Sequence, residues 1–127
     1  MAEQTRTTAI TLVIDDDEPR AAVYVSARRH RDDLIVVTVR GEIDLSNISL
    51  LEGELAGHEE EPWLVIDMSG VRFCGVAGAR LLHTMAIRAL TDGRRFELID
   101  NPAIARVLEA TGLAKDITRR TSIRPPP

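Results

Sequence analysis

The residues most able to do chemistry in this chain lie around one turn, in the stretch DMSGVRFCGVAGARLL, residues 67–82. The turn contains Cys74, the single cysteine of the chain, and His83 follows nine residues later. A helix rises 1.5 Å per residue, so a helical path between these two side chains spans about 13 Å. A nucleophile and its base need hydrogen-bond distance. We therefore expect no enzyme and no catalytic residue.

Cys74 allows two interpretations. A thiol beside a helix N-terminus can have a lowered pKa, which would make Cys74 a possible redox site. A buried cysteine, in contrast, usually packs as a small apolar side chain. Strand alternation counted from Phe73 does not decide which way Cys74 points.

Metal and cofactor chemistry has little support in the sequence. His83 has no histidine, cysteine or carboxylate at ligand spacing on its helical face, which favours a surface histidine. Gly75 and Gly78 do not form a dinucleotide or P-loop motif. Asp67 is expected to end a buried strand and to accept hydrogen bonds from backbone N–H groups of the following turn. We predict no metal and no cofactor.

Composition excludes several further classes. The chain has 127 residues, a net charge of −4 and only four aromatic side chains, without a block of lysine and arginine. A nucleic-acid surface needs such a basic block, so we expect no direct contact with nucleic acid. No apolar run approaches 18 residues, and the N-terminus has no signal-peptide core. We predict a cytoplasmic protein without membrane insertion.

The first half of the chain predicts a hairpin, a helix and a strand. In an N-terminal extension, residues 1–20, the segment AITLVI (9–14) is either an extra strand or an apolar extension. AVYVSA (22–27) and LIVVTVRG (34–41) read as paired strands, joined by a loop that is too long for a two-residue turn. A helix within 44–58 follows, with Ser46 or Ser49 as cap and a capping-box spacing from Ser49 to Glu52. WLVIDMS (63–69) is a buried strand.

The second half alternates helices and strands. A helix from about Ala77 ends near TDGRR, and FELID (96–100) is the next strand. NPAIARVLEATGL (101–113) has Asn101 as N-cap, Pro102 at the first helical position and Gly112 as its stop. DITRR (116–120) could add a last strand, before a flexible tail at 122–127. We predict an α/β fold: one domain over 21–121, with a small mixed sheet and amphipathic helices mainly on one face.

The helix beginning near Val76 has two different faces. At 100° per residue, Gly78, Leu81, Leu82, Met85 and Ala89 form the core side. Val76, Arg80, His83 and Ile87 cluster on the opposite side. Single exposed apolar residues are ordinary, and a partner-binding surface explains the same stripe; both interpretations stay open.

Three phrases of the sequence resemble a known family. VVTVRGEIDLSN, WLVIDMSGVRF and NPAIARVLEATGL resemble the STAS domain of bacterial anti-sigma factor antagonists, in the family's order and over residues 21–120. The resemblance implies a STAS-like fold and partner switching. In such switching the unphosphorylated antagonist binds a kinase-like anti-sigma factor and frees a sigma factor for transcription.

The resemblance also identifies what is missing. The family's turn typically reads Asp-Ser-Ser-Gly, and it corresponds here to Gly75, Val76, Ala77 and Gly78. Ala77 stands at the position of the acceptor serine, so phosphorylation cannot act there. The family places the loop after Gly41 beside this turn, although its polar residues could equally cap the following helix. The predicted partner-binding residues are Asp44, Ser46, Asn47, Gly75, Val76, Ala77, Gly78, Arg80, His83 and Ile87.

Two other functions remain open at this stage. STAS domains also serve as subunits of transporters or as scaffolds of sensory complexes, where a turn without an acceptor serine is no handicap. A sensor built on Cys74 is the third possibility. We expect a monomer or a weak homodimer with an anti-sigma factor as its main partner.

Overall fold

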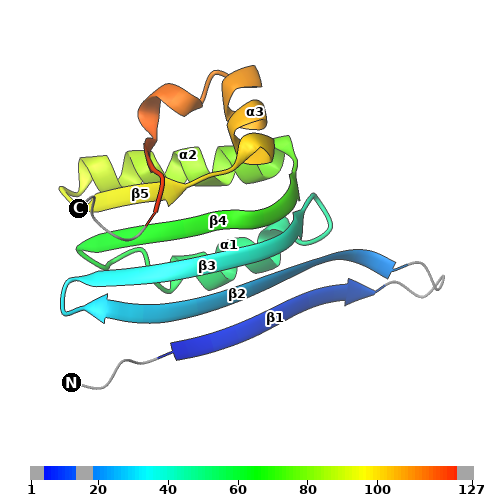
Figure 1. Ribbon diagram of the computed structural model, residues 1–127, viewed down its shortest axis with the longest axis horizontal. Helices are drawn as coiled ribbons and strands as arrows, with labels where there is room; N and C mark the ends of the chain where they lie inside the picture. The colour runs from blue at the N-terminus through cyan, green and yellow to red at the C-terminus, as the bar shows by residue number, and fades with distance from the viewer. Residues whose placement is uncertain (1–4, 14–18, 123–127) are drawn as a thin grey trace.

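The computed structural model of the chain describes residues 5–13 and 19–122 (Figure 1). Ile14, the end of the first apolar segment, lies outside this range. The six strands are β1 (Thr5–Val13), β2 (Pro19–Arg31), β3 (Leu34–Ile43), β4 (Trp63–Cys74), β5 (Arg95–Ile99) and β6 (Thr118–Arg120). The helices are α1 (Ile48–Ala56), α2 (Val76–Thr91), α3 (Pro102–Ala110) and the short 3-10 helix η1 (Ala114–Asp116).

The strands form a single mixed sheet in the order β1-β2-β3-β4-β5-β6. β1, β2 and β3 pair antiparallel, whereas β3 to β6 pair parallel. Antiparallel neighbours need only a tight turn, but parallel neighbours need a crossover, and α1, α2 and α3 lie in the three crossovers. The predicted mixed α/β sheet is confirmed. The division into 1–20, 21–121 and 122–127 stays a prediction.

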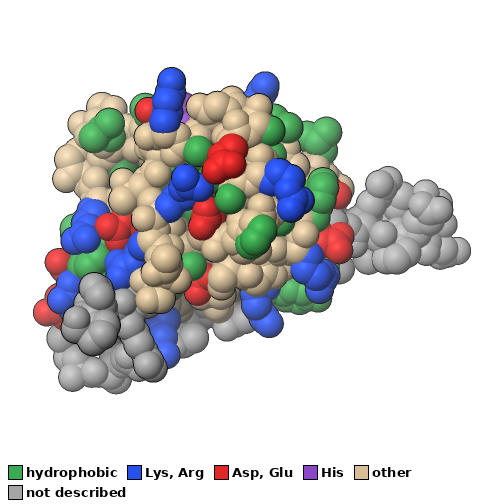
Figure 2. Space-filling model, turned by 45° about the horizontal axis from the view of Figure 1, so that its top comes forward, with side chains coloured by type: hydrophobic (Ala, Val, Ile, Leu, Met, Phe, Trp, Pro, Cys, Tyr) green, Lys and Arg blue, Asp and Glu red, His purple; other side chains and the backbone are tan. Residues whose placement is uncertain are grey.

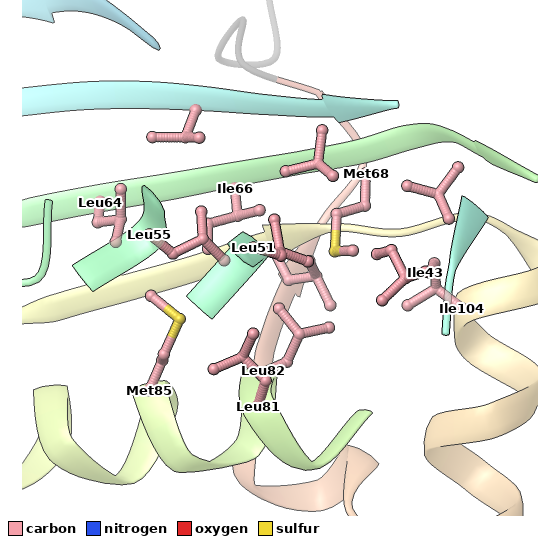
Figure 3. Close-up of a cluster of buried hydrophobic side chains, with 14 of the residues drawn as sticks. Ile43, Leu51, Leu55, Leu64, Ile66, Met68, Leu81, Leu82, Met85 and Ile104 are labelled. Carbon is pink, nitrogen blue, oxygen red and sulfur yellow. The ribbon is translucent and has the colours of Figure 1, made fainter. Parts of the chain in front are cut away.

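All three α-helices pack against the same face of the sheet (Figures 1 and 3). β4 supplies the centre of the core, with Ile66 fully buried and Met68 nearly so. Figure 3 shows these side chains pointing from the sheet toward the helices. The predicted placement of the helices on one face is therefore confirmed. Each helix contributes buried side chains to this cluster: Leu51 and Leu55 from α1, Leu82 and Met85 from α2, Ile104 and Leu108 from α3.

The cap residues of α3 are those that its sequence predicts. The Asn101 side chain accepts a hydrogen bond from the Ile104 N–H at 2.9 Å, and Pro102 occupies the first helical position. Gly112 follows the helix with a φ of +74°, a conformation that favours glycine. Asn101 also donates to the carbonyl oxygen of Val71 at 2.7 Å, so its side chain ties α3 to β4.

Two predicted boundaries in the first half are wrong. β2 continues through Arg31, which pairs with Leu34, so the hairpin has the two-residue turn Asp32–Asp33. A register shift between Arg29 and Arg31 absorbs the extra residue. Neither Ser46 nor Ser49 caps α1: Asn47 is the N-cap residue, and no side chain caps that helix end.

β4 is also longer than predicted, because Asp67 does not end it. The strand runs on to Cys74 with two register shifts against β3. Asp67 does accept the predicted local bond, from the Ser69 N–H at 3.0 Å. Ser69 and Gly70 resemble turn residues in the sequence, but here they lie within a bulged strand.

The other face of the sheet carries a small apolar cluster against which Trp63 packs, and long polar side chains surround Trp63 there. The cluster consists of Leu34, Val36, Val65 and Ile99. Glu97, only 7% exposed, accepts bonds from Trp63 Nε1 at 3.0 Å, Arg95 Nε at 2.9 Å and Arg120 Nη1 at 2.9 Å. The Arg95 guanidinium stacks 3.8 Å from the Trp63 ring centre. Burial raises the pKa of Glu97, but the hydrogen bonds from Trp63, Arg95 and Arg120 outweigh it and leave the pKa below its ordinary value. Glu97 thus holds β4, β5 and β6 together.

Replacing Glu97 with glutamine should destabilise the domain in a pH-dependent way. Charge-assisted bonds to a buried group stabilise by about 1–3 kcal/mol, so we expect Glu97→Gln to lower the free energy of unfolding by that amount at pH 7. Because the folded pKa is depressed, this stabilisation is complete above the unfolded pKa of about 4.3. It is lost as the pH falls through the folded value. Urea denaturation at pH 7 and at acidic pH, with exposed Glu60→Gln as control, tests this. Equal effects of the two substitutions would contradict the assigned role.

Candidate partner-binding site

Two connecting segments meet at one end of the sheet. β3 and β4 are parallel and end side by side, with Ile43 paired to Cys74. The Gly75 N–H then donates to the Ile43 carbonyl oxygen at 2.9 Å. The loop from β3 to α1 and the turn from β4 to α2 are therefore neighbours, although about thirty residues of chain separate them.

The loop after β3 is organised by its own side chains. Asp44 accepts hydrogen bonds from the Ser46 N–H at 2.8 Å and from the Ser46 hydroxyl. Asn47, 1% exposed, accepts from the Asp44 N–H at 3.1 Å and donates to the Glu42 carbonyl oxygen at 2.8 Å. The predicted capping role of these polar residues is replaced by a loop-bracing role. This bracing sets the position of Leu45, between Asp44 and Ser46.

α2 begins without a side-chain cap. Gly75 is its N-cap residue, with an extended backbone, and no side chain bonds to the first helical N–H groups. The Gly75 carbonyl accepts from the N–H groups of Gly78 at 3.1 Å and Ala79 at 3.3 Å. Glycine costs only a few tenths of a kcal/mol relative to a good N-cap, so the helix forms without one. Ala77 lies in this first turn and is partly buried.

Cys74 faces the core, 6% exposed, and its Sγ lies 3.5 Å from the Gly75 carbonyl oxygen. Burial raises the pKa of the thiol to about 11. A reactive cysteine needs the opposite shift. The structure thus favours the interpretation of Cys74 as a small packing side chain.

A bulge in β4 decides which side chains at its end point outward. Gly41 pairs with Val71 and Glu42 with Phe73, so Arg72 is an extra residue in β4. Strict alternation would bury Phe73 with Val71. The bulge reverses the phase, so that Cys74 is buried and Phe73 is 53% exposed.

An open hollow of about 600 Å³ lies where the loop and the turn meet. Its exposed apolar side chains are Leu45, 84% exposed, Phe73 and Val76, 47% exposed. Arg80 also lines the hollow and is exposed. Six of the ten predicted partner-binding residues line the hollow, and Leu45 and Phe73 are additional. The lining residues are Asp44, Leu45, Ser46, Phe73, Gly75, Val76, Ala77 and Arg80.

The four other predicted residues lie outside the hollow. Asn47 and Gly78 are buried beneath it. His83 is partly buried, and its Nε2 lies 2.9 Å from Asp116 Oδ2, which joins α2 to η1. Ile87 lies on α2, one turn beyond His83, and is 37% exposed.

Other kinds of site find no support in the part of the chain that the structure describes. It contains no group of three or more histidine, cysteine or acidic side chains that could hold a metal ion. None of its helices is both long and apolar enough to cross a membrane. Figure 2 shows acidic and basic side chains interspersed on the face in view. That face therefore presents no continuous basic stripe.

The fold and the hollow define an α/β domain with a partly apolar surface suited to contact another macromolecule. The family model described as "Mlab, STAS domain" matches residues 26–122, and the chain belongs to the STAS domain family. No curated protein matches the chain.

Solved structures support the same assignment. An anti-sigma factor antagonist from Mycobacterium paratuberculosis is 28% identical, with a TM-score of 0.67 over 91% of this chain and 88% of that one. A Moorella thermoacetica RsbS variant is 25% identical, with a TM-score of 0.59 over 73% and 83%. The phosphorylated Bacillus cell fate determinant SpoIIAA is 14% identical, with a TM-score of 0.60 over 77% and 92%, a likeness of fold alone.

Gly78 allows α2 to start close against the ends of β3 and β4. A Cβ at this position would lie 2.6 Å from Cys74 Sγ and 3.1 Å from Ile43 Cγ2. We expect Gly78→Ala to destabilise the domain by about 1–3 kcal/mol through overpacking. Cys74→Ala removes the nearer atom, so the double substitution should cost less than the sum of the single ones.

A double-mutant cycle by chemical denaturation measures this coupling. Gly53→Ala in α1 is the control, because a Cβ at Gly53 meets no atom within 4 Å. Additive effects of Gly78→Ala and Cys74→Ala would contradict the contact.

Proposed function

We propose that this protein is an anti-sigma factor antagonist whose phosphorylation switch is absent. It binds an anti-sigma factor through the hollow at the start of α2 and so regulates sigma-factor-dependent transcription. The observation that carries the proposal is the hollow itself: exposed Leu45, Phe73 and Val76 line it together with Ala77, the position that the resemblance assigns to the family's acceptor serine. The 28% identical antagonist, which covers 91% of this chain, supports the kind of partner.

The chemistry of the hollow agrees with a protein partner. Its apolar side chains supply contact area, and Arg80 and Asp44, which also line it, supply charges of both signs. Interfaces commonly combine an apolar centre with a polar rim. Leucine, phenylalanine and valine side chains left in water each gain roughly 1.5–3 kcal/mol when fully buried. The kinase-like nature of the partner rests on the family resemblance.

A negative charge at Ala77 should weaken binding without unfolding the protein. Aspartate in the first turn of a helix is favourable, so Ala77→Asp should keep the stability of the domain. In the complex the same carboxylate would be buried without a partner. We expect the affinity for the anti-sigma factor to fall at least about ten-fold, equivalent to 1.4 kcal/mol.

The experiment is a pull-down from native cytoplasm with tagged wild type and variants, followed by mass spectrometry and titration of the identified partner. Thr84→Asp, the same charge at an exposed position of α2 outside the hollow, is the matched control. Phe73→Ala should lose binding, whereas Leu90→Ala, at a 76% exposed position elsewhere, should not. Unchanged binding by Ala77→Asp would refute the placement of the interface.

Restoring a hydroxyl at this turn should restore the switch. Ala77→Ser places the hydroxyl in the first turn of α2, where free N–H groups favour a phosphate. With ATP and the identified kinase-like partner, intact-mass spectrometry should show one phosphate on Ala77→Ser and none on the wild type. Equal phosphorylation of both proteins would mean that another residue carries the switch.

A STAS subunit or scaffold of a transporter or sensory complex is the second candidate. The absence of an acceptor hydroxyl at Ala77 favours it, because such a role needs no phosphorylation. The same pull-down discriminates: recovery of a transporter ATPase with the wild type, in place of an anti-sigma factor, would support this candidate.

A further inference from the structure

β1 leaves one long edge of the sheet without a partner strand. Its nine residues, Thr5–Val13, pair with β2 on one side, and no described strand pairs on the other. Figure 1 shows β1 at the border of the sheet with no element beyond it. In an antiparallel ladder, residues alternate between directing their N–H and C=O groups to one neighbour and to the other. The outer edge of β1 therefore carries a row of backbone donors and acceptors.

Apart from a register shift against β2 between Thr11 and Val13, this edge lacks the features that usually prevent strand pairing. Its sequence TRTTAITLV contains no proline and no lysine, and Arg6 is its single charged residue. Threonine, isoleucine and valine favour strands. The opposite edge is different, because its strand β6 has only three residues. Arg119 forms an ion pair with Asp100 at 3.1 Å, and Arg120 forms one with Glu97 at 2.9 Å. Only the β1 edge is long enough to form a new ladder.

We propose that β1 is a homodimerisation edge, which pairs antiparallel with β1 of a second copy. A strand meets its own copy antiparallel about a two-fold axis, so a single surface serves both partners. The geometry joins the two six-stranded sheets into one continuous sheet. A second copy of the chain supplies an identical strand, so this pairing needs no strand from another protein.

The length of the strand determines the pairing register. With the two-fold axis at Ala9, the regular part of β1, Thr5–Thr11, lies opposite β1 of the other copy, and the register shift between Thr11 and Val13 falls near each end of the ladder. Any other centre shortens the ladder. Ala9 then faces Ala9, Thr7 faces Thr11 and Thr8 faces Ile10. Arg6 faces Leu12, so the pairing opposes no like charges.

The dimer and the partner-binding hollow are independent. The described residues that line the hollow are 44–46, 73, 75–77 and 80, and none of these belongs to β1. A dimer would carry two hollows, so a partner with two binding surfaces would be held with increased avidity. This consequence rests on the proposed function; the dimer itself does not.

Disulfide trapping tests both the edge and its register. Ala9→Cys in a Cys74→Ala background should form a disulfide-linked dimer under mild oxidation, because directly opposed residues have Cα atoms about 4.5–5.5 Å apart. Leu12→Cys in the same background is the matched control. In the proposed register, residue 12 faces residue 6 of the other copy, so the two cysteines would lie about 20 Å apart along the strands. Mixed Thr7→Cys and Thr11→Cys proteins should cross-link to each other more than either does to itself.

Sedimentation without a cross-link completes the test. The wild type should approach twice the 14.0 kDa mass of one chain as its concentration rises, whereas Ala9→Lys, which opposes two like charges, should remain monomeric. Ala9→Lys should still bind the partner captured by the wild type. A monomeric wild type, or equal trapping of Ala9→Cys and Leu12→Cys, would overturn the dimer. Unchanged partner binding by Ala77→Asp would refute the proposed interface and leave the dimer unaffected, so the two proposals fail separately.

Discussion

The parallel pairing of β3 with β4 is the constraint on which the rest of the structure depends. It runs from Leu34 opposite Trp63 to Ile43 opposite Cys74, through Ile66, which is fully buried. Because parallel strands need a crossover, α1 must cross from one end of the sheet to the other. Because both strands end at the same edge, the segments that follow them must meet. The position of the hollow is thus a consequence of strand direction.

The same pairing explains how an apolar side chain reaches the surface at that edge. β4 has more residues than β3 along their common ladder, and the excess is absorbed by bulges. The second bulge reverses the alternation, exchanging the sides of Phe73 and Cys74. The thiol fills the space that Gly78 leaves beside β3, and the phenyl ring joins Leu45 and Val76. The one extra residue in β4 therefore has two effects: it buries the Cys74 thiol and it exposes the Phe73 ring.

Sequence reasoning succeeds where the determinants are local. The limits of α3 could be predicted because Asn101, Pro102 and Gly112 each act on the adjacent backbone. It fails where pairing overrides local preference. Ser69 and Gly70 have turn propensity, yet β3 keeps them in β4, and a two-residue turn closes the β2–β3 hairpin because a bulge absorbs the additional residue.

The same contrast between local and long-range determinants applies to the candidate site. The family resemblance located the turn, including Ala77, but Leu45 and Phe73 were missed. Their exposure depends on a bulge and on loop bracing by Asp44 and Asn47, neither of which has a local signal. The contact between His83 and Asp116 joins residues 33 positions apart and depends on where η1 packs.

The apolar content of the hollow bears on why alanine suits position 77. A serine hydroxyl enclosed by a partner needs a hydrogen-bond acceptor or donor there, and leaving it unpaired costs roughly 1–3 kcal/mol. The alanine methyl group carries no such requirement and adds to the surface formed by Phe73 and Val76. In the proposed complex, alanine at this position would therefore make the contact more uniformly apolar than serine would. A surface of this kind favours binding that depends on the concentrations of the two proteins rather than on a covalent signal.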